Sequence, residues 1–333
     1  MKVFDCFLFF NELDLLDLRL NLLSDHVDYF VIVESALTFQ GEEKEFIFEK
    51  NINRFNQFKN KIIYFKIDKY SLNFNELPYI YNPQNVDEEI LNRIYKFIDE
   101  CPHFDKKEEF WWGNDFYQRE CISRALATAS PNKDDLILIS DVDEIPNPNI
   151  IDELKKNITP QSLFCLQQHE FCYFLNYYHN SNWFGSCCFL YDKFKKTSLN
   201  AIRFSIKRDE GLSPKIINDA GWHFTSIGNI NAIQNKIKSW GHREFNNKLI
   251  LNTIEYNIKH GYDIFRRPGF GKLNYLEVNN NILPSIIKKD IKLYSHLVGP
   301  IIMTENSIQK IYHSFIFKIN FKIYNYFKIY FNK

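Results

Sequence analysis

The first part of the chain alternates between short apolar runs and a leucine repeat at helical spacing. Residues 2–10 are dense in β-branched and aromatic side chains, which favours a strand. Asn11 follows, with Asp14 three residues on, and this pair resembles a helix-capping box. Residues 29–33 are continuously apolar, as in a strand buried on both faces. Between these two predicted strands, Leu13, Leu16, Leu20 and Leu23 form one apolar stripe at helical spacing. The pattern predicts a β-α-β opening.

The same alternation continues to about residue 140. Residues 62–67 and 136–139 read as strands, and residues 88–99 and 115–129 as helices. Strands that alternate with helices build a mostly parallel, doubly wound sheet. The predicted fold class is therefore α/β, with a Rossmann-like central sheet flanked by helices. Ligands of such sheets bind beyond the carboxyl ends of the strands.

The pattern changes after residue 146 but shows no break between domains. No Ser/Gly-rich linker divides the chain. We therefore expect a single domain over residues 1–306, with a nucleotide-type half (1–146) and an acceptor-type half (147–306). Four further elements are predicted in the second half: a helix at 149–156, strands at 163–175 and 186–191, and a helix at 231–240.

The C-terminal segment, residues 307–333, consists largely of Phe, Tyr, Ile, Asn and Lys. It fits two interpretations. As a helix in a membrane interface, its aromatic side chains would enter the headgroup boundary while its lysines meet anionic lipid. As a packed C-terminal helix, it would only reflect the biased composition of the chain.

Composition narrows the class of protein. The 333 residues include 41 Lys and Arg against 41 Asp and Glu, and zero net charge argues against a general nucleic-acid binder. Hydrophobic residues make up 45% of the chain, enough for a sizeable core. The seven cysteines form no C-x-x-C pair, and no apolar run is long enough for a membrane-spanning helix. We expect free thiols and a cytoplasmic protein.

The clearest candidate chemistry is an acidic doublet. The predicted strand at 136–139 runs into Ser-Asp-Val-Asp-Glu-Ile-Pro at 140–146. Asp141 and Asp143, at positions i and i+2, can face one cation if the backbone turns there. Mg²⁺ and Mn²⁺ commonly take one or two carboxylates together with phosphate oxygens. The doublet therefore indicates a site for a metal and a nucleotide diphosphate.

Other interpretations of the doublet were weighed. A calcium EF-hand is excluded, because no third acid and central glycine follow at the required spacing. A haloacid-dehalogenase-like phosphatase would use Asp141 as a nucleophile. That family's doublet usually lies near the N-terminus and is followed by other residue types than Glu144. A purely structural acidic turn also fits the residues.

A histidine in the second half is a further candidate. His223 lies in Gly-Trp-His-Phe at 221–224, where the glycine permits a close backbone approach. Its imidazole is either a ligand of a manganese ion held by the doublet or a hydrogen-bonded interior side chain.

Sugar transfer to a hydroxyl with inversion needs a general base. Asp219, which is close to His223 in sequence, and Glu244, at the end of a predicted helix, are our leading candidates. The sequence does not choose among the full set, which is Glu170, Asp209, Glu210, Asp219 and Glu244.

Three segments together resemble glycosyltransferase family 17, the family of the β-1,4-mannosyl-glycoprotein β-1,4-N-acetylglucosaminyltransferase. The resemblance implies a GT-A fold, a UDP-sugar donor such as UDP-GlcNAc, a divalent metal (Mn²⁺ or Mg²⁺) and inversion at the anomeric carbon. The segments are residues 9–16 with Arg19 and the later 27–35, the acidic segment at 141–146, and residues 221–224 followed by Lys236 and Ser239.

The resemblance also implies roles for individual residues. Asp141 and Asp143 would hold the metal and the diphosphate, with His223 as a further metal ligand. Arg119, on the helix before the doublet, would neutralise phosphate. Uridine would lie beside four residues at the ends of the first two strands: Asn11, Glu12, Glu34 and Thr38. For Asn11 and Glu12, a helix cap is the alternative explanation.

The chain departs from the animal members of the family, which carry an N-terminal membrane anchor and a lumenal stem. Here the sequence begins at the first strand. We therefore expect a cytoplasmic enzyme, held at the inner face of the membrane if residues 307–333 bind lipid. Its acceptor would be an oligosaccharide such as a lipid-linked or cell-surface glycan. The alternatives are the phosphatase and a non-catalytic, glycan-binding relative.

Overall fold

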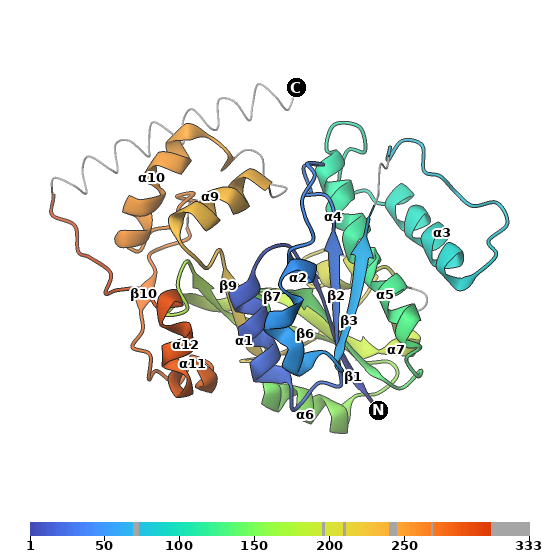
Figure 1. Cartoon of the computed structure of the whole chain (residues 1–333), viewed down its shortest axis with the longest axis horizontal. Helices are drawn as coiled ribbons and strands as arrows, with labels where there is room; N and C mark the ends of the chain where they lie inside the picture. The colour runs from blue at the N-terminus through green and yellow to red at the C-terminus, as the bar shows by residue number, and fades with distance from the viewer. Residues whose placement is uncertain (69–72, 195–196, 209–210, 240–244, 268, 308–333) are drawn as a thin grey trace.

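The computed structural model describes residues 1–68, 73–194, 197–208, 211–239, 245–267 and 269–307. The segment 307–333 thus lies outside the described residues, apart from its first position. The described chain is built around one sheet of ten strands (Figure 1). The strands are β1 (Val3–Phe9), β2 (Tyr29–Ser35), β3 (Ile62–Ile67), β4 (Leu136–Asp141), β5 (Glu144–Pro146), β6 (Leu163–Cys172), β7 (Tyr177–Leu190), β8 (Lys215–Ile217), β9 (Gly221–Thr225) and β10 (Asn274–Tyr275).

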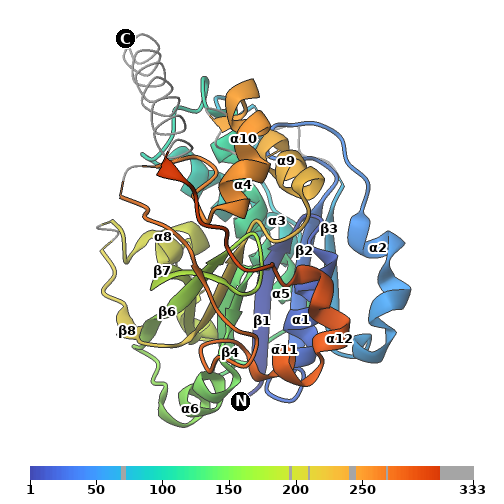
Figure 2. The same cartoon turned by 90° about the vertical axis from the view of Figure 1, so that its left-hand side faces the viewer.

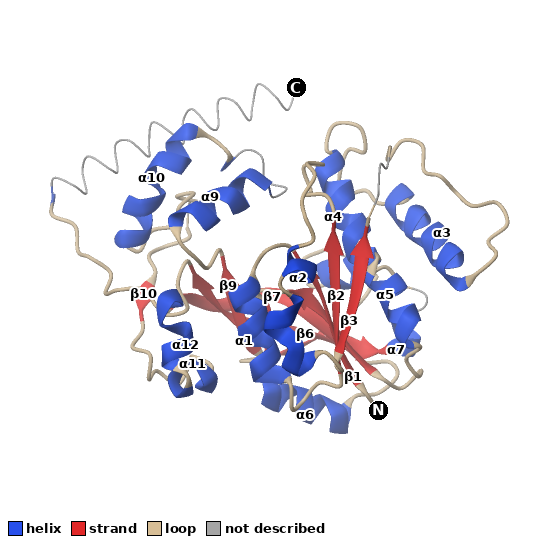
Figure 3. Cartoon of the chain, in the orientation of Figure 1, coloured by secondary structure: helices blue, strands red, loops and turns tan. Residues whose placement is uncertain are grey.

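Helices flank this sheet (Figure 3). Among the described residues, no helix is long and apolar enough to cross a membrane. The helices are α1 (Leu13–Leu23), α2 (Ile47–Lys50), α3 (Val86–Asp99), α4 (Phe110–Glu120), α5 (Ile122–Ala129), α6 (Pro148–Asn157), α7 (Tyr191–Phe194), α8 (Leu199–Phe204), α9 (Ile230–Ser239), α10 (Lys248–Lys259), α11 (Ser285–Lys289) and α12 (Ile291–Tyr294), with 3₁₀ helices at Ile52–Phe58 and Ser295–Leu297.

The strand order is β3-β2-β1-β4-β7-β6-β9-β5, with β8 beside β6 and β10 beside β7. The first four strands are parallel, and Phe7 of β1 lies opposite Ile32 of β2 and Ser140 of β4. From β7 onward parallel and antiparallel pairs mix. Because β1, β2 and β4 run in one direction, their carboxyl ends meet at one edge of the sheet. The predicted α/β class with a Rossmann-like, mostly parallel sheet is confirmed.

Alternate side chains of the central strands enter two separate cores. Phe7 of β1 packs with α1, α6 and α12 on one face of the sheet. Its neighbour Cys6 packs with α3, α4 and α5 on the other face. Both side chains are fully buried. This period of two, buried on both sides, explains why these strands read as continuous apolar runs in the sequence.

The C-terminal part of the described chain makes two separate contacts. Helices α9 and α10 form a third core with the start of β7, centred on Tyr177, Ile233 and Ile254. Helix α12 returns to the N-terminal half and lies beside α1 (Figure 2). There the Tyr294 hydroxyl donates to Asp17 at 3.3 Å, and Asp17 is buried.

Two predicted local features need correction. The expected helix at 115–129 is two helices, α4 and α5, which meet at Cys121. The capping box at Asn11 is wrong: Glu12 is the N-cap of α1, and its side chain makes no capping hydrogen bond. Instead, the Glu12 carboxylate accepts from the backbone amides of Phe10 (3.3 Å) and Asn11 (3.0 Å). It thereby satisfies the amides of the loop before the helix.

Candidate active site

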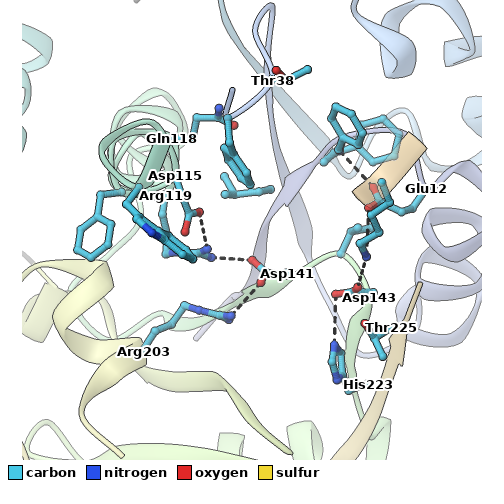
Figure 4. Close-up of a pocket in the computed structure, with 18 of the residues that line it drawn as sticks. Glu12, Thr38, Asp115, Gln118, Arg119, Asp141, Asp143, Arg203, His223 and Thr225 are labelled. Atoms are coloured by element: carbon cyan, nitrogen blue, oxygen red, sulfur yellow. Dashed lines mark hydrogen bonds and ion pairs between the residues drawn. The ribbon is translucent and has the colours of Figure 1, made fainter. Parts of the chain in front are cut away.

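The carboxyl ends of β1, β2 and β4 open into a cleft of about 550 Å³ (Figure 4). Its walls come from distant parts of the chain. Phe10 follows β1, Arg119 comes from α4, Arg203 from α8, His223 from β9 and Lys236 from α9. The cleft occupies the edge of the sheet where doubly wound folds bind their ligands.

The floor of the cleft is the acidic turn between β4 and β5, and a buried arginine shapes it. Arg19 of α1 is fully buried and pairs with Asp5 of β1 at 2.5 Å. Its guanidinium also donates to the backbone carbonyls of Asp141 (2.9 Å), Val142 (3.2 Å) and Glu144 (2.9 Å). Since these carbonyls point inward to Arg19, the side chains of Asp141 and Asp143 are left to line the cleft.

Asp141 accepts from two arginines, which come from α4 and α8 and approach it from the same side in Figure 4. Its Oδ1 accepts from Arg119 at 2.6 Å, and its Oδ2 accepts from Arg203 at 2.9 Å. Burial alone would raise the pKa of Asp141, but the two guanidinium groups hold it well below its usual range. Both oxygens of this anionic carboxylate are therefore engaged, which argues against Asp141 as a phosphatase nucleophile.

Glu144, the first residue of β5, is fully buried and does not line the cleft. Its Oε2 accepts from Arg203 at 2.6 Å, and its Oε1 accepts from the Trp183 indole at 2.8 Å. Gly185 makes room for this arrangement, because a Cβ there would lie 1.9 Å from Glu144 Oε1. Arg203 of α8 thus links Asp141 and Glu144.

Asp143 faces the other side of the cleft. Its Oδ2 accepts from Lys236 Nζ at 3.1 Å, and its Oδ1 lies 3.9 Å from His223 Nε2 (Figure 4). His223 reaches this position because β9 pairs closely with β5. Gly221 has a φ of +148°, and a Cβ there would lie 2.3 Å from the Ile145 carbonyl oxygen. The predicted close backbone approach at this glycine is confirmed.

The donor atoms at this point fit a divalent cation that is completed by substrate oxygens. In the described part of the chain, no three acidic, histidine or cysteine side chains lie close enough to hold a metal by themselves. Asp143 Oδ1 and His223 Nε2 nevertheless face one another across 3.9 Å. A carboxylate and an imidazole suit Mn²⁺, and Mg²⁺ is commonly held by one or two carboxylates plus phosphate. Both oxygens of Asp141 are already bound to arginine.

His223 is surrounded by groups that restrict its ring. The Trp183 indole stacks on it, with 3.9 Å between centroids and 20° between planes. On the side away from Asp143, its Nδ1 lies 3.7 Å from Glu170 Oε1. Burial alone would raise the pKa of Glu170, but His179 and His223 lower it to about 2. Glu170 is therefore an anion behind His223.

The uridine-site candidates divide into two groups. Glu12 and Thr38 line the cleft, as does Arg119. Neither Asn11 nor Glu34 is among the described residues of its wall.

Glu34 has a structural task instead. It is fully buried, and its carboxylate accepts from the backbone amides of Ile47 (2.6 Å) and Phe48 (3.1 Å) at the start of α2. The Tyr64 hydroxyl and the Lys44 ammonium also bind it, each at 2.8 Å. These contacts attach the segment after β2 to the sheet. They also account for the burial of the Glu34 carboxylate, with no need for a ligand there.

The general-base candidates are not brought together. Asp219 has a side chain that is 78% exposed and pairs with His169 at 3.4 Å. It precedes β9, whereas the cleft lies at Thr225, at the other end of that strand. Glu170 lies behind His223. Three candidates, Asp209, Glu210 and Glu244, fall outside the described residues.

Sequence reasoning missed four basic residues of the cleft, which are Lys44, Arg203, Lys207 and Arg208. Arg203 and Lys207 belong to α8 and the turn after it, and no local motif marks them. Lys236 was noted only as part of the family-like segment. The Lys207 ammonium lies 4.5 Å from the centre of the Trp183 ring, and burial lowers its pKa. A signal available in the sequence was the clustering of Arg203, Lys207 and Arg208 within six residues.

A Rossmann-like sheet whose strand ends carry this acidic turn and basic cleft is consistent with a glycosyltransferase fold. The sequence model of the family described as glycosyltransferase family 17 matches residues 1–97 and 90–270 of the chain. The chain therefore belongs to glycosyltransferase family 17. No curated protein gives a significant match to it.

Proposed function

We propose that this enzyme is an inverting, metal-dependent transferase that moves GlcNAc from UDP-GlcNAc, β-1,4, to a mannose or similar sugar of an oligosaccharide. The observation that carries the proposal is the charge of the cleft, in which six basic side chains line the wall against four acidic ones. This excess complements the anionic diphosphate of a nucleotide-sugar. The basic residues are Lys44, Arg119, Arg203, Lys207, Arg208 and Lys236, and the acidic ones are Glu12, Asp115, Asp141 and Asp143.

Aromatic side chains of the cleft suit a nucleobase. Phe10 and Phe39 follow β1 and β2, and Trp112 comes from α4. Aromatic side chains can stack on any nucleobase, because every base has a flat π-face. Thr38 and Glu12, which also line the cleft, would contact uridine. The choice of UDP-GlcNAc rather than another nucleotide-sugar rests on membership of family 17.

The proposed reaction is a single displacement. A base takes the proton from the acceptor hydroxyl, whose oxygen attacks the anomeric carbon as the bond from that carbon to the β-phosphate oxygen breaks. The electron pair of that bond leaves on UDP, and preorganised basic side chains stabilise the developing charge. We propose Glu244 as the base, since it follows α9, which already carries Lys236 into the cleft.

Asp143 and His223 would hold the divalent cation, with Asp141 beside them in the turn. A bound cation there would add positive charge next to the leaving diphosphate. The protein's own part is to keep these groups in place before the donor arrives: Arg19 fixes the turn, and Arg119 and Arg203 fix Asp141.

The acceptor is proposed to be an oligosaccharide, such as a lipid-linked or cell-surface glycan. Residues 307–333 are proposed to contact the cytoplasmic face of the membrane. The support is the lysine and aromatic composition of that segment. A chain that ends at residue 307 should bind anionic liposomes more weakly than the full chain. Equal binding would remove the membrane part of the proposal.

The test of the function is UDP release from a panel of UDP-sugars, with Mn²⁺, with Mg²⁺ and with EDTA. Slow donor hydrolysis is followed, so no acceptor is needed. We expect metal-dependent UDP release from UDP-GlcNAc, and its loss in Asp143→Asn. Asp219→Asn is the matched control, because it removes a carboxylate just before β9, the strand that pairs with β5, but outside the cleft. Equal release by Asp143→Asn and wild type, or release of phosphate from simple esters without any UDP-sugar turnover, would contradict the proposal.

A further inference from the structure

We propose that Glu170 and His179 are positioning residues that orient the His223 imidazole, so that its Nε2 is the nitrogen offered to the cation. This inference rests on the proposed function, because it concerns the same cation site. It assigns a task to two residues that do not line the cleft and that the proposed mechanism leaves unused.

The face of the His223 ring is packed, whereas its Nδ1 makes no hydrogen bond in the described part of the chain. Trp183 stacks on the ring and fixes its plane. Within that plane, Nε2 faces Asp143 Oδ1 at 3.9 Å, while Nδ1 faces Glu170 Oε1 at 3.7 Å. Nδ1 is buried and has no hydrogen-bond partner in the described part of the chain. A buried donor of this kind costs free energy until it finds an acceptor, and the Glu170 carboxylate lies within a small movement of it.

Glu170 is itself held in place from behind. Its Oε2 lies 2.5 Å from His179 Nδ1. The other nitrogen of His179 lies 2.5 Å from the Phe270 carbonyl oxygen, and the His179 ring stacks on the Phe270 ring with 3.7 Å between centroids. Neither Glu170 nor His179 can turn without breaking these contacts.

The three groups come from neighbouring strands, which fixes their relative positions. Glu170 of β6 lies opposite His223 of β9 on one side and opposite Asn180 of β7, next to His179, on the other. The chain of contacts therefore runs across the sheet from the 270 region to the cleft. Side chains in direct register on paired strands are close neighbours, so this order is set by the strand pairing itself.

The chemical consequence concerns the tautomer of His223. A carboxylate beside Nδ1 selects the form with the proton on Nδ1, which leaves the lone pair on Nε2. Nε2 is the atom that faces Asp143 and the cleft. Carboxylate groups behind a metal-binding histidine act in this way in other proteins, and their loss typically weakens metal binding 10–100-fold.

The experiment measures Mn²⁺ binding directly rather than turnover. Wild type, Glu170→Gln, His179→Asn and His223→Ala are titrated with Mn²⁺ in the presence of UDP, and free Mn²⁺ is followed by electron paramagnetic resonance. Spin-echo modulation then reports whether an imidazole nitrogen is bound to the ion. We expect about 10–100-fold weaker Mn²⁺ binding by Glu170→Gln, with weakened nitrogen modulation. Modulation should be absent in His223→Ala.

Asp219→Asn is the matched control, because Asp219 forms a similar acid–imidazole pair with His169 of the same strand β6 and lies outside the cleft. It should bind Mn²⁺ as wild type does. Equal affinity and equal nitrogen modulation in wild type, Glu170→Gln and His179→Asn would overturn this inference and leave the proposed function intact. Absence of Mn²⁺ binding by wild type would overturn the metal site of the proposed function, and the inference with it. His179→Asn keeps the test informative if Glu170→Gln does not fold.

Discussion

The guanidinium of Arg19 donates a hydrogen bond of 2.9 Å to the backbone carbonyl of Asp141, a residue 122 positions further along the chain. The same guanidinium binds Asp5 on β1 and the Ser140 hydroxyl at the end of β4. One buried side chain therefore joins the first helix to the acidic turn. The direction in which Asp141 and Asp143 project depends on a residue that never enters the cleft.

Arg19→Lys should destabilise the protein although it keeps the charge. An ammonium cannot reach Asp5 and the backbone carbonyls of the turn at the same time, and each buried acceptor left without a donor costs about 1–3 kcal/mol. We expect a loss of about 3 kcal/mol in the free energy of unfolding, measured with urea, together with weaker UDP binding. Arg54→Lys is the control, since Arg54 is partly exposed and pairs with Asp14 at the surface. A stability equal to wild type would show that the turn does not depend on the guanidinium.

Gly185→Ala should disturb the cleft through packing alone. The new Cβ would lie 1.9 Å from Glu144 Oε1 and 2.5 Å from the Trp183 indole nitrogen, so the bond between these residues has to break. We expect at least about 2 kcal/mol of destabilisation, because a buried acid loses a partner, and a change in tryptophan fluorescence. Gly271→Ala is the control without a packing clash, because no atom lies within 4 Å of the new Cβ. It should cost less, although its φ of +79° adds a backbone strain that Gly185 does not have. Equal losses in the two variants would contradict the role given to Gly185.

Arg203→Met should have an effect that depends on pH. Burial alone would raise the pKa of Glu144, but Arg203 holds it below the ordinary 4.5. The pair therefore adds stability above about pH 4.5, and this stability is lost as the pH falls through the lower folded-state pKa. In the variant, buried Glu144 has no guanidinium to offset its charge. Its pKa rises, and the variant is destabilised most where Glu144 is ionised.

The measurement is urea unfolding of wild type and Arg203→Met at pH 7.5, 5.5 and 4. The difference in the free energy of unfolding should be about 3–5 kcal/mol at pH 7.5 and should shrink towards pH 4. Arg208→Met, at an exposed neighbour on the same wall, should give a small difference at every pH. A difference that is constant with pH would show that Arg203 acts by packing rather than by charge.

Much of the fold could be predicted from the sequence, because the patterns that indicate helices and strands are local. The leucines of α1 and the apolar runs of β1, β2 and β4 indicate buried residues within a few positions of one another. The structure confirms these elements. The acidic turn was visible for the same reason, as an apolar strand that runs into charged residues. The break between α4 and α5 at Cys121 was not visible, since both segments keep helical spacing.

The contacts that shape the cleft are long-range and leave no local trace. Arg203 meets Asp141 and Glu144 from 62 and 59 residues away, so neither spacing nor composition could pair them. Asp219 shows the opposite error, in which closeness in sequence to His223 suggested closeness in space. A strand advances about 3.3 Å per residue, and Asp219 lies before the start of β9 while the cleft lies at its end.

The most direct test of the account is the affinity for UDP, measured by calorimetry with and without Mn²⁺, for wild type and Asp143→Asn. We predict that Mn²⁺ tightens UDP binding by wild type at least about tenfold, equivalent to about 1.4 kcal/mol, and leaves the affinity of Asp143→Asn unchanged. Both proteins should unfold at similar urea concentrations, because asparagine has the shape of aspartate and its amide oxygen can still accept from Lys236. If Mn²⁺ has the same effect on both proteins, or none on wild type, the acidic turn is not the site at which a metal and a nucleotide diphosphate meet.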